Sequence, residues 1–260
     1  MGEVILEGRE LTIQFGGLTA VSNFNASIQK GSIVGLIGPN GAGKTTCFNM
    51  MSGFYVPTSG KVFFNGTEIT HTPPYEVCRL GMARTFQNIR LFGNGTVLQN
   101  VMVGCHVRQQ TSWWQTLLYL PSNLKEEKRL EEKSMELLKV VALEKFADEK
   151  ARSLPYGAQR RLEIARALAT EPNFLLLDEP AAGMNPNETN ELMTFIRRIR
   201  DQFKLTILLI EHDMKVVMGV CEHMWVLDHG ETIAEGPPES IKQNPRVIEA
   251  YLGEEYVADA

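Results

Sequence analysis

A glycine-rich loop between a predicted strand and a predicted helix restricts the fold of this chain more than any other feature. The loop reads GPNGAGKTT over residues 38–46 and matches the pattern G-x-x-x-x-G-K-[ST]. It follows the apolar run IVGLI (33–37), which predicts a strand buried on both faces, and precedes CFNMMSG (47–53), which predicts a helix closed by its last glycine. A chance glycine-rich turn is the alternative, but the order strand, loop and helix is the context in which this pattern binds nucleotide phosphates.

The residues of this loop predict how a nucleotide is held. Gly38, Gly41 and Gly43 allow backbone N–H groups to turn inward toward phosphate oxygens. Lys44 is expected to reach the β- and γ-phosphates of ATP, and the Thr45 hydroxyl is expected to bind Mg²⁺. The other positions predicted to bind the nucleotide are Pro39, Asn40, Ala42 and Thr46.

A second predicted strand ends in two acids. The run FLLLDE (174–179) predicts a central strand that brings Asp178 to the edge of a sheet, where its carboxylate can hold Mg²⁺ through water. Glu179 can then act as the catalytic base that polarises the water attacking the γ-phosphate. Apolar strands that end in acids are common, so this motif alone is a weak signal. Together with the phosphate-binding loop it predicts a nucleotide site.

The remaining pattern predicts an α/β fold. Short β-type runs precede the loop, and the Asn-Gly pair within KVFFNGTEI (61–69) suits a two-residue type I′ hairpin turn. Strand patterns at 205–211 and 223–230 alternate with helical segments, which indicates a mostly parallel sheet with flanking helices. Residues from about 95 to 150 have helical periodicity and many charges. We therefore expect a P-loop NTPase core with an antiparallel β-subdomain and an inserted helical subdomain.

Composition excludes several classes of protein. The formal net charge of −5 argues against a general nucleic-acid binder, which needs a basic face. The four cysteines are far apart and show no C-x-x-C spacing, which favours free thiols in a reducing cytoplasm. No secretory signal and no apolar stretch of about 20 residues is present, so any membrane role is expected to come through a partner.

A second candidate phosphate site lies at LPYGAQRRLEIARAL (154–168). The run predicts a helix that begins near Gly157, and the amino end of a helix can bind an anion. An ordinary amphipathic helix is the alternative. Because this helix runs directly into FLLLDE (174–179), the region resembles the signature of the ATP-binding cassette family. That resemblance implies that two cassettes pack head to tail and that Gly157 contacts the ATP held by the loop of the other cassette.

The resemblance assigns roles to three further residues. Phe15 stands upstream of the loop, where the family stacks an aromatic ring on adenine. Gln87, in ARTFQN, matches the glutamine that touches Mg²⁺ and couples to the transport partner. His212, in LLIEHDM, matches the histidine that contacts the γ-phosphate. Taken alone, these residues could be a core phenylalanine, a surface amide and a structural histidine.

The chain departs from the family pattern at four positions. Pro155, Tyr156 and Ala158 replace the serine, the first glycine and the glutamine of the signature, and Asn185 replaces the aspartate of the loop after the acidic strand. Pro155 offers neither a hydroxyl nor an N–H, so the γ-phosphate of the neighbouring site would depend on the amides of the helix end. These departures leave Lys44 and the catalytic glutamate in place.

The resemblance covers nearly the whole chain and is strongest to the first ATP-binding subunit of branched-chain amino acid importers. It implies an ATPase core at 1–89 and 158–235, a helical subdomain at 90–157 and a C-terminal tail at 236–260. It also implies that the helical subdomain, near Gln87, meets integral membrane permease subunits on the cytoplasmic face of the inner or plasma membrane.

Three rival functions remain at this stage. A cytosolic P-loop kinase would lack the signature helix, and a cassette acting on DNA or ribosomes would usually carry two cassettes or a long coiled-coil insertion. A transporter of another cargo, such as urea, short amides or an exported lipid, would keep the same ATPase. The sequence also contains an apolar island with Trp113 and Trp114, which either packs on neighbouring helices or docks on a membrane subunit.

Overall fold

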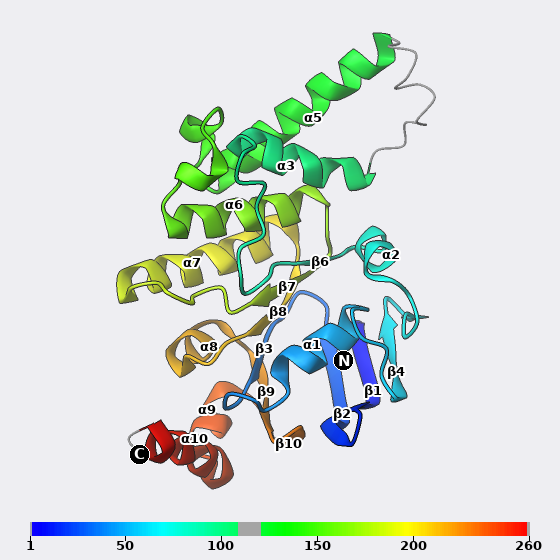
Figure 1. The fold of residues 1–260 in the computed structure, drawn as a ribbon, viewed down its shortest axis with the longest axis vertical. Coiled ribbons are helices and arrows are strands. Elements are labelled where there is room, and N and C mark those ends of the chain that lie inside the picture. Colours follow the sequence, from blue (N-terminus) through cyan, green and yellow to red (C-terminus); the bar gives the residue numbers. More distant parts are fainter. Residues whose placement is uncertain (1, 109–120, 259–260) are drawn as a thin grey trace. The chain divides into compact units, whose positions relative to one another are not determined.

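The computed structural model describes residues 2–108 and 121–258. The chain divides into two compact units, the first formed by Met1–Val77 with Asn173–Ala260 and the second by Cys78–Pro172. The first unit contains two sheets with helices, and the second is mainly helical (Figure 1). The boundaries expected from the sequence for the helical subdomain, 90 and 157, stay a prediction. The island around Trp113 and Trp114 lies outside the described residues.

An antiparallel sheet opens the first unit, with strand order β2-β1-β4-β5. In the hairpin between β4 and β5, Phe64 pairs with Thr67, and the two residues between them have positive φ, 51° at Asn65 and 75° at Gly66. Left-handed conformations at both central residues are those of the type I′ turn that the sequence predicted. The strands of this sheet are β1 (Val4–Phe15), β2 (Leu18–Gln29), β4 (Ser59–Phe64) and β5 (Thr67–Glu68).

The second sheet of this unit holds the strands that precede the predicted site residues. Its order within the unit is β10-β9-β3-β8-β7, and β3 pairs in parallel with both β8 and β9. Every residue of β3, β7 and β8 is buried, as expected for continuous apolar runs in a sheet covered on both faces. The bounds are β3 (Ile33–Ile37), β7 (Phe174–Asp178), β8 (Thr206–Ile210), β9 (His223–Asp228) and β10 (Glu231–Gly236).

Helices cover this parallel sheet. Figure 1 shows α1 and α8 on opposite sides of β3, with α7 beside α8. Near β9 and β10 lie α9 and α10, and Val247 of α10 is buried whereas Ile248 is 46% exposed. The helices of the first unit are α1 (Lys44–Met51), α7 (Pro186–Phe203), α8 (Met214–Val220), α9 (Pro238–Lys242) and α10 (Pro245–Ala258), and α2 (Pro74–Arg79) crosses into the second.

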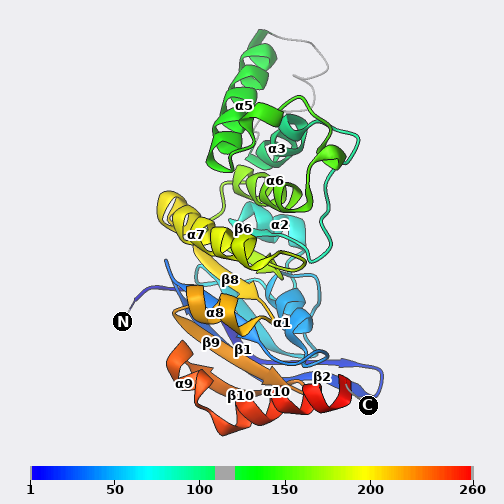
Figure 2. The ribbon, with the colours of Figure 1, turned by 90° about the vertical axis from the view of Figure 1, so that its left-hand side faces the viewer.

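The described residues of the second unit include the helices α3 (Val97–Cys105), α5 (Pro121–Val140) and α6 (Tyr156–Ala169), which pack against one another (Figures 1 and 2). The short strand β6 (Met82–Arg84) and single turns at His106–Arg108, Glu144–Phe146 and Ala151–Ser153 complete it. Five apolar residues follow helical spacing on and after α5: Leu130 is half-buried, and the other four are buried, Leu137, Leu138, Val141 and Leu143.

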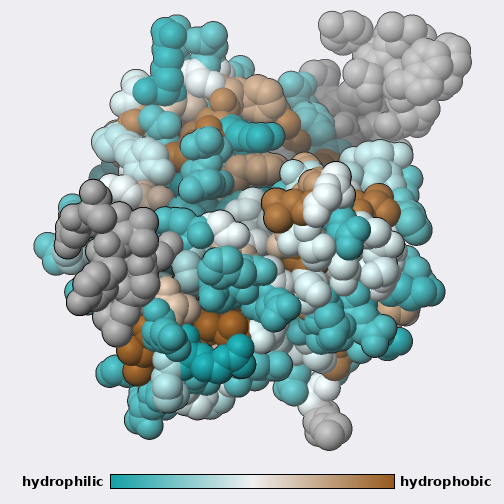
Figure 3. Space-filling model, turned by 60° about the horizontal axis from the view of Figure 1, so that its bottom comes forward, coloured by the Kyte–Doolittle hydropathy of each residue, from teal (hydrophilic) through white to brown (hydrophobic). Residues whose placement is uncertain are grey.

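Other expectations from composition can be compared with the described residues. All four cysteines carry free thiols, and three of them are buried. Among the described helices, none combines the length and the apolar composition that a membrane crossing requires. On the face shown in Figure 3, apolar side chains lie in small patches separated by hydrophilic ones.

Candidate functional site

The glycine-rich loop adopts backbone conformations that other residues rarely reach. Gly38 and Gly43 have φ of 147° and 98°. A Cβ at Gly38 would lie 2.0 Å from the Leu227 carbonyl oxygen, and one at Gly43 would lie 2.7 Å from the Ala20 carbonyl oxygen. Because both neighbours are backbone atoms that cannot rotate away, glycine is required at each position. The loop is therefore shaped by its packing against β2 and β9.

Backbone hydrogen bonds brace the loop from the turn between β9 and β10. The Gly230 N–H donates to the Ala42 carbonyl at 3.0 Å, and the Ser22 N–H donates to the Gly230 carbonyl at 2.8 Å. One glycine thus links the loop to strand β2. A loop held in this way is ready to bind a phosphate without first being ordered.

Lys44 is the first residue of α1 and lies over the loop. It is only 6% exposed, and its Nζ donates to the carbonyl oxygens of Gly38 and Pro39 at 2.6 and 2.7 Å. The helix has no side-chain cap at Gly43 and no acid in its first turn, and Thr45 on that turn is exposed. The N–H groups of the first turn, the positive helix end and the ammonium group together suit a phosphate chain.

The acidic pair follows the carboxyl end of β7. Asp178 is 4% exposed and pairs in register with Ile210 of β8. Glu179 has a φ of 43°, which is rare for a residue with a side chain, and its N–H donates to the Ile210 carbonyl at 3.0 Å. Strained backbone of this kind is often found where a side chain must point in a particular direction for function.

His212 and Glu179 lie together, although 33 residues separate them in the sequence. The His212 Nδ1 atom is 3.7 Å from Glu179 Oε2, and the imidazole side chain is 56% exposed. Both residues follow parallel strands that end at the same edge of the sheet. The structure thus brings together the residue predicted to be the base and the residue predicted to contact the γ-phosphate.

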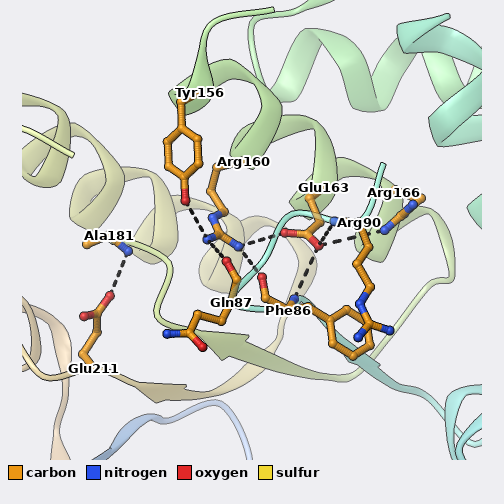
Figure 4. A network of polar contacts seen from close by, with 9 residues as sticks. All are labelled: Phe86, Gln87, Arg90, Tyr156, Arg160, Glu163, Arg166, Ala181 and Glu211. Carbon is orange, nitrogen blue, oxygen red and sulfur yellow. Dashed lines mark hydrogen bonds and ion pairs between the residues drawn. The ribbon is translucent and has the colours of Figure 1, made fainter. Parts of the chain in front are cut away.

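The sequence analysis missed Glu211, the residue before His212. Its side chain is 1% exposed, and its Oε1 accepts a 2.8 Å hydrogen bond from the Ala181 N–H (Figure 4). Burial raises the pKa of Glu211 to about 7, and the nearby Glu179 and Asp213 carboxylates act in the same direction. The available signal was the acid that ends the apolar run LTILLIE, the same pattern that identified Asp178.

The donor set fits a magnesium ion bound together with nucleotide. No group of three or more His, Cys, Asp or Glu side chains in the described part of the chain is arranged to hold a metal by itself. Mg²⁺ in nucleotide sites needs only one or two protein oxygens, because phosphates and waters complete its octahedron. The Thr45 hydroxyl and the Asp178 carboxylate are oxygen donors of that kind, next to the phosphate loop and at the end of β7.

Phe15 ends β1 and is 47% exposed, so it is not a core residue. Its ring meets the ring of Tyr55 edge to face, with centroids 5.4 Å apart. Tyr55, which the sequence analysis did not single out, is 39% exposed. Two partly exposed aromatic rings form a surface on which a planar base can stack.

Gln87 and Gly157 belong to the second unit. Gln87 is exposed in a segment without helix or strand, and its side chain extends away from Arg160 in Figure 4. Gly157 is the second residue of α6, which has Pro155 at its N-cap, no side-chain cap and no acid in its first turn. The amino end of α6 therefore keeps backbone N–H groups that a helix cannot satisfy itself.

Asn185 serves as the N-cap of α7. Its Oδ1 accepts from the N–H groups of Asn187 and Glu188 at 3.0 Å each, and Glu188 Oε2 accepts from the Asn185 N–H at 2.9 Å. This reciprocal arrangement is a capping box. The asparagine thus supports the helix that follows the acidic strand, and its lack of charge does not disturb that role.

Comparison with known proteins decides the family. Residues 21–182 match the family model described as ABC transporter, which is more than half of the chain. The chain belongs to the ABC transporter family. Residues 231–257 also match a model described as branched-chain amino acid ATP-binding cassette transporter.

Relatives and solved structures agree with this membership. The chain is 46% identical over 254 residues to the high-affinity branched-chain amino acid transport ATP-binding protein BraF of Pseudomonas aeruginosa, covering 98% of this chain and 100% of that protein. It is 45% identical, with the same coverage, to LivG of Escherichia coli K12, which bears the same description. A nucleotide-free ATP-binding cassette from an ABC transporter superposes with a TM-score of 0.83 at 32% identity, covering 96% of this chain and 99% of the other.

These findings confirm three of the predictions made from the sequence. The fold is that of a P-loop cassette, and the family is that of the ABC transporter ATPases. ATP is the nucleotide that this family binds. The roles of the individual site residues are not tested by these comparisons and stay predictions.

Proposed function

We propose that this chain is the ATP-hydrolysing subunit that powers a membrane importer of branched-chain or related hydrophobic amino acids. The main evidence for this transported solute is the full-length similarity to BraF and LivG. The separate match of residues 231–257 to the branched-chain amino acid cassette model supports it. Urea, short amides and an exported lipid are the competing cargoes, and no observation favours them.

The site residues support a division of roles in hydrolysis. Lys44 and the loop amides hold the β- and γ-phosphates, and Phe15 with Tyr55 offers a surface for the adenine. The Thr45 hydroxyl and the Asp178 carboxylate would hold Mg²⁺, with Gln87 as the further ligand expected from the family resemblance, and the ion would neutralise charge on the phosphates. Residues that act mainly by position and charge are what phosphoryl transfer requires.

Glu179 and His212 complete this proposal. Glu179 accepts a proton from the attacking water, and His212 donates a hydrogen bond to a γ-phosphate oxygen. The two side chains are 3.7 Å apart, which supports the proposal that they contact the attacking water and the γ-phosphate at one site. The positive φ of Glu179 supports this role, because strained backbone is often found at functional residues.

Two kinds of partner follow from this proposal. A second cassette, either a copy of this chain or a related subunit, places its nucleotide against the amino end of α6, where Gly157 serves as the clamp. Integral membrane permease subunits contact the helical unit near Gln87 and hold the chain on the cytoplasmic face of the membrane. Nucleic acid is not among the expected partners, since the net charge is −5.

The experiment that tests this function is uptake by the reconstituted transporter. The full chain is copurified with its membrane subunits and placed in vesicles, and ATP-dependent uptake of radiolabelled leucine is compared with uptake of urea. We expect leucine uptake that stops in Glu179→Gln, with ATP retained and little phosphate released, because binding is separate from the base. Urea uptake in place of leucine would overturn the cargo, and normal phosphate release by Glu179→Gln would overturn the site.

A further inference from the structure

A fully buried ion pair lies one turn into α6. Arg160 Nη1 and Glu163 Oε2 are 2.9 Å apart, and the two side chains are 0% and 1% exposed. Removing two charges from water costs several kcal/mol for each ion, and their attraction offsets this only when the remaining polar atoms also find partners. The position of those partners therefore indicates what the pair is for.

Backbone groups of one irregular segment are partners of both side chains of the pair. Arg160 donates to the carbonyl oxygens of Phe86 and Gln87 at 2.6 and 2.8 Å (Figure 4). Glu163 Oε1 accepts from the N–H groups of Phe86 and Arg90 at 3.4 and 3.3 Å. No helix or strand spans residues 85–95, so the segment has no ladder of its own to hold it. Side chains of α6 hold its first part, Phe86 to Arg90, and Asn100 of α3 holds Phe92.

Arg160 also contacts the first residue of its own helix. Its Nη2 lies 3.3 Å from the Tyr156 hydroxyl, and its guanidinium stands 6.0 Å from the centre of the tyrosine ring. Tyr156 is 45% exposed at the amino end of α6. A single guanidinium thus touches the amino end of α6 and the backbone of Gln87.

We propose that Arg160 is a positioning residue, which fixes the Gln87 backbone to α6 and so links the nucleotide at the amino end of this helix to the nucleotide that Gln87 serves. The inference rests on the proposed function, because that function gives Gln87 and the α6 end to nucleotide sites of two different cassettes. Arginine suits the task since its planar fork can hold two carbonyls and a carboxylate at once. A lysine has a single donor nitrogen and can bind fewer of these three groups at once.

The test is a double-variant cycle on ATP hydrolysis by the assembled transporter, with Arg160→Gln, Gln87→Ala and the combination. Arg160→Gln is expected to lower kcat at least about tenfold with KM for ATP changed less than about threefold, because a small misplacement of a catalytic group mainly affects turnover. When Gln87 is already alanine, adding Arg160→Gln is expected to lower kcat by less than about twofold further. Arg160→Lys is expected to recover part of the loss.

Several outcomes would overturn the inference. One is a folded Arg160→Gln variant with kcat within twofold of the parent, and another is a combined variant whose losses multiply, because a residue that only supports the fold would not act through Gln87. Arg152→Gln, which removes an exposed arginine just before α6, is the matched control and should leave kcat unchanged.

Two further variants keep the test decisive where Arg160→Gln fails to fold. Tyr156→Phe removes only a hydroxyl from an exposed ring and is expected to lower kcat about two- to threefold, an effect that disappears when Gln87 is alanine. Arg160→Met with Glu163→Leu removes both buried charges, which proteins often tolerate, and full kcat in that variant would overturn the inference. An inactive parent transporter would overturn the proposed function and this inference together, whereas an active parent with unaffected variants overturns only this inference.

Discussion

Three side chains with charged groups are almost fully buried in the part of the chain that forms the predicted nucleotide site. Lys44, Asp178 and Glu211 are 6%, 4% and 1% exposed. Asp178 ends β7, Glu211 directly follows β8, and Lys44 begins α1 after the loop that follows β3. A buried charge is costly unless it is paired, so it is kept where function or a dedicated partner requires it. A phosphate group of a ligand is such a partner for a lysine, and a metal ion is such a partner for a carboxylate.

Glu211 gives a prediction about pH. Its pKa is about 7 in the folded chain, above the ordinary value of 4.5, so the folded state binds its proton more tightly than the unfolded state does. The stabilising contribution is therefore complete below pH 4.5 and is lost as the pH rises through 7. Glu211→Gln, which stays neutral, is expected to match the parent near pH 4.5 and to be more stable by roughly 1–3 kcal/mol at pH 8.

Chemical denaturation of the parent and of Glu211→Gln between pH 4.5 and pH 8 measures this difference in the free energy of unfolding. His212, Glu179 and Asp213 are the titratable groups that face Glu211, and the Ala181 N–H can donate to a glutamine oxygen as it does to the carboxylate. The exposed Glu231→Gln on β10 is the control and should change stability little at any pH. A Glu211→Gln advantage that is equal at pH 4.5 and pH 8 would contradict the assignment.

Secondary-structure elements were predictable where a local pattern determined them, and contacts between distant segments were not. The strand predicted at 33–37 has those bounds, because a continuous apolar run has only a buried position to occupy. The spacing of Arg160 and Glu163, three residues apart on a helix, is equally that of an exposed ion pair, so it does not predict burial. Their burial depends on the segment at 85–95 folding over them, and no local pattern encodes that contact. For Glu211, the acid that ends the run LTILLIE was a local signal, but its hydrogen bond with Ala181, 30 residues away, could not be predicted from a local pattern.

A close approach between α3 and α6 gives a prediction at the scale of the element. A Cβ at Gly104 would lie 2.3 Å from the Arg166 carbonyl oxygen and 2.8 Å from the Ala169 Cβ, so the two helices would have to separate. Gly104→Ala is expected to destabilise the chain by about 1–3 kcal/mol, although alanine favours a helix by about 1 kcal/mol over glycine. Thermal or urea denaturation measures this difference.

Gly219→Ala in α8 is the matched control. The Cβ there would meet the sulfur of Met193 at 2.7 Å, which is the far end of a flexible side chain. Because methionine can rotate away, the helix-forming gain of alanine should offset most of the cost. Equal stability of Gly104→Ala and the parent would show that α3 and α6 can move apart freely.

The loop predicted to bind phosphate is held by segments that are far apart in the sequence. The first unit consists of Met1–Val77 and Asn173–Ala260, and β3, which leads into the phosphate loop, is flanked by β8 and β9 from the second of these segments. The loop is further braced by Gly230 of the same segment. The phosphate site therefore exists only in the folded first unit, and a ligand that binds there stabilises folding.

This dependence predicts the response of the molecule to ATP. At a concentration about 100 times its Kd, ATP with Mg²⁺ should stabilise the fold by about 2.7 kcal/mol, and each further tenfold rise should add about 1.4 kcal/mol. Lys44→Ala should lose most of this gain, because it removes the buried ammonium that is predicted to contact the phosphates. Lys61→Ala removes an exposed lysine of β4 and should keep the full gain. Thermal unfolding over a range of ATP concentrations measures both, and an equal shift in Lys44→Ala would mean that the nucleotide binds elsewhere.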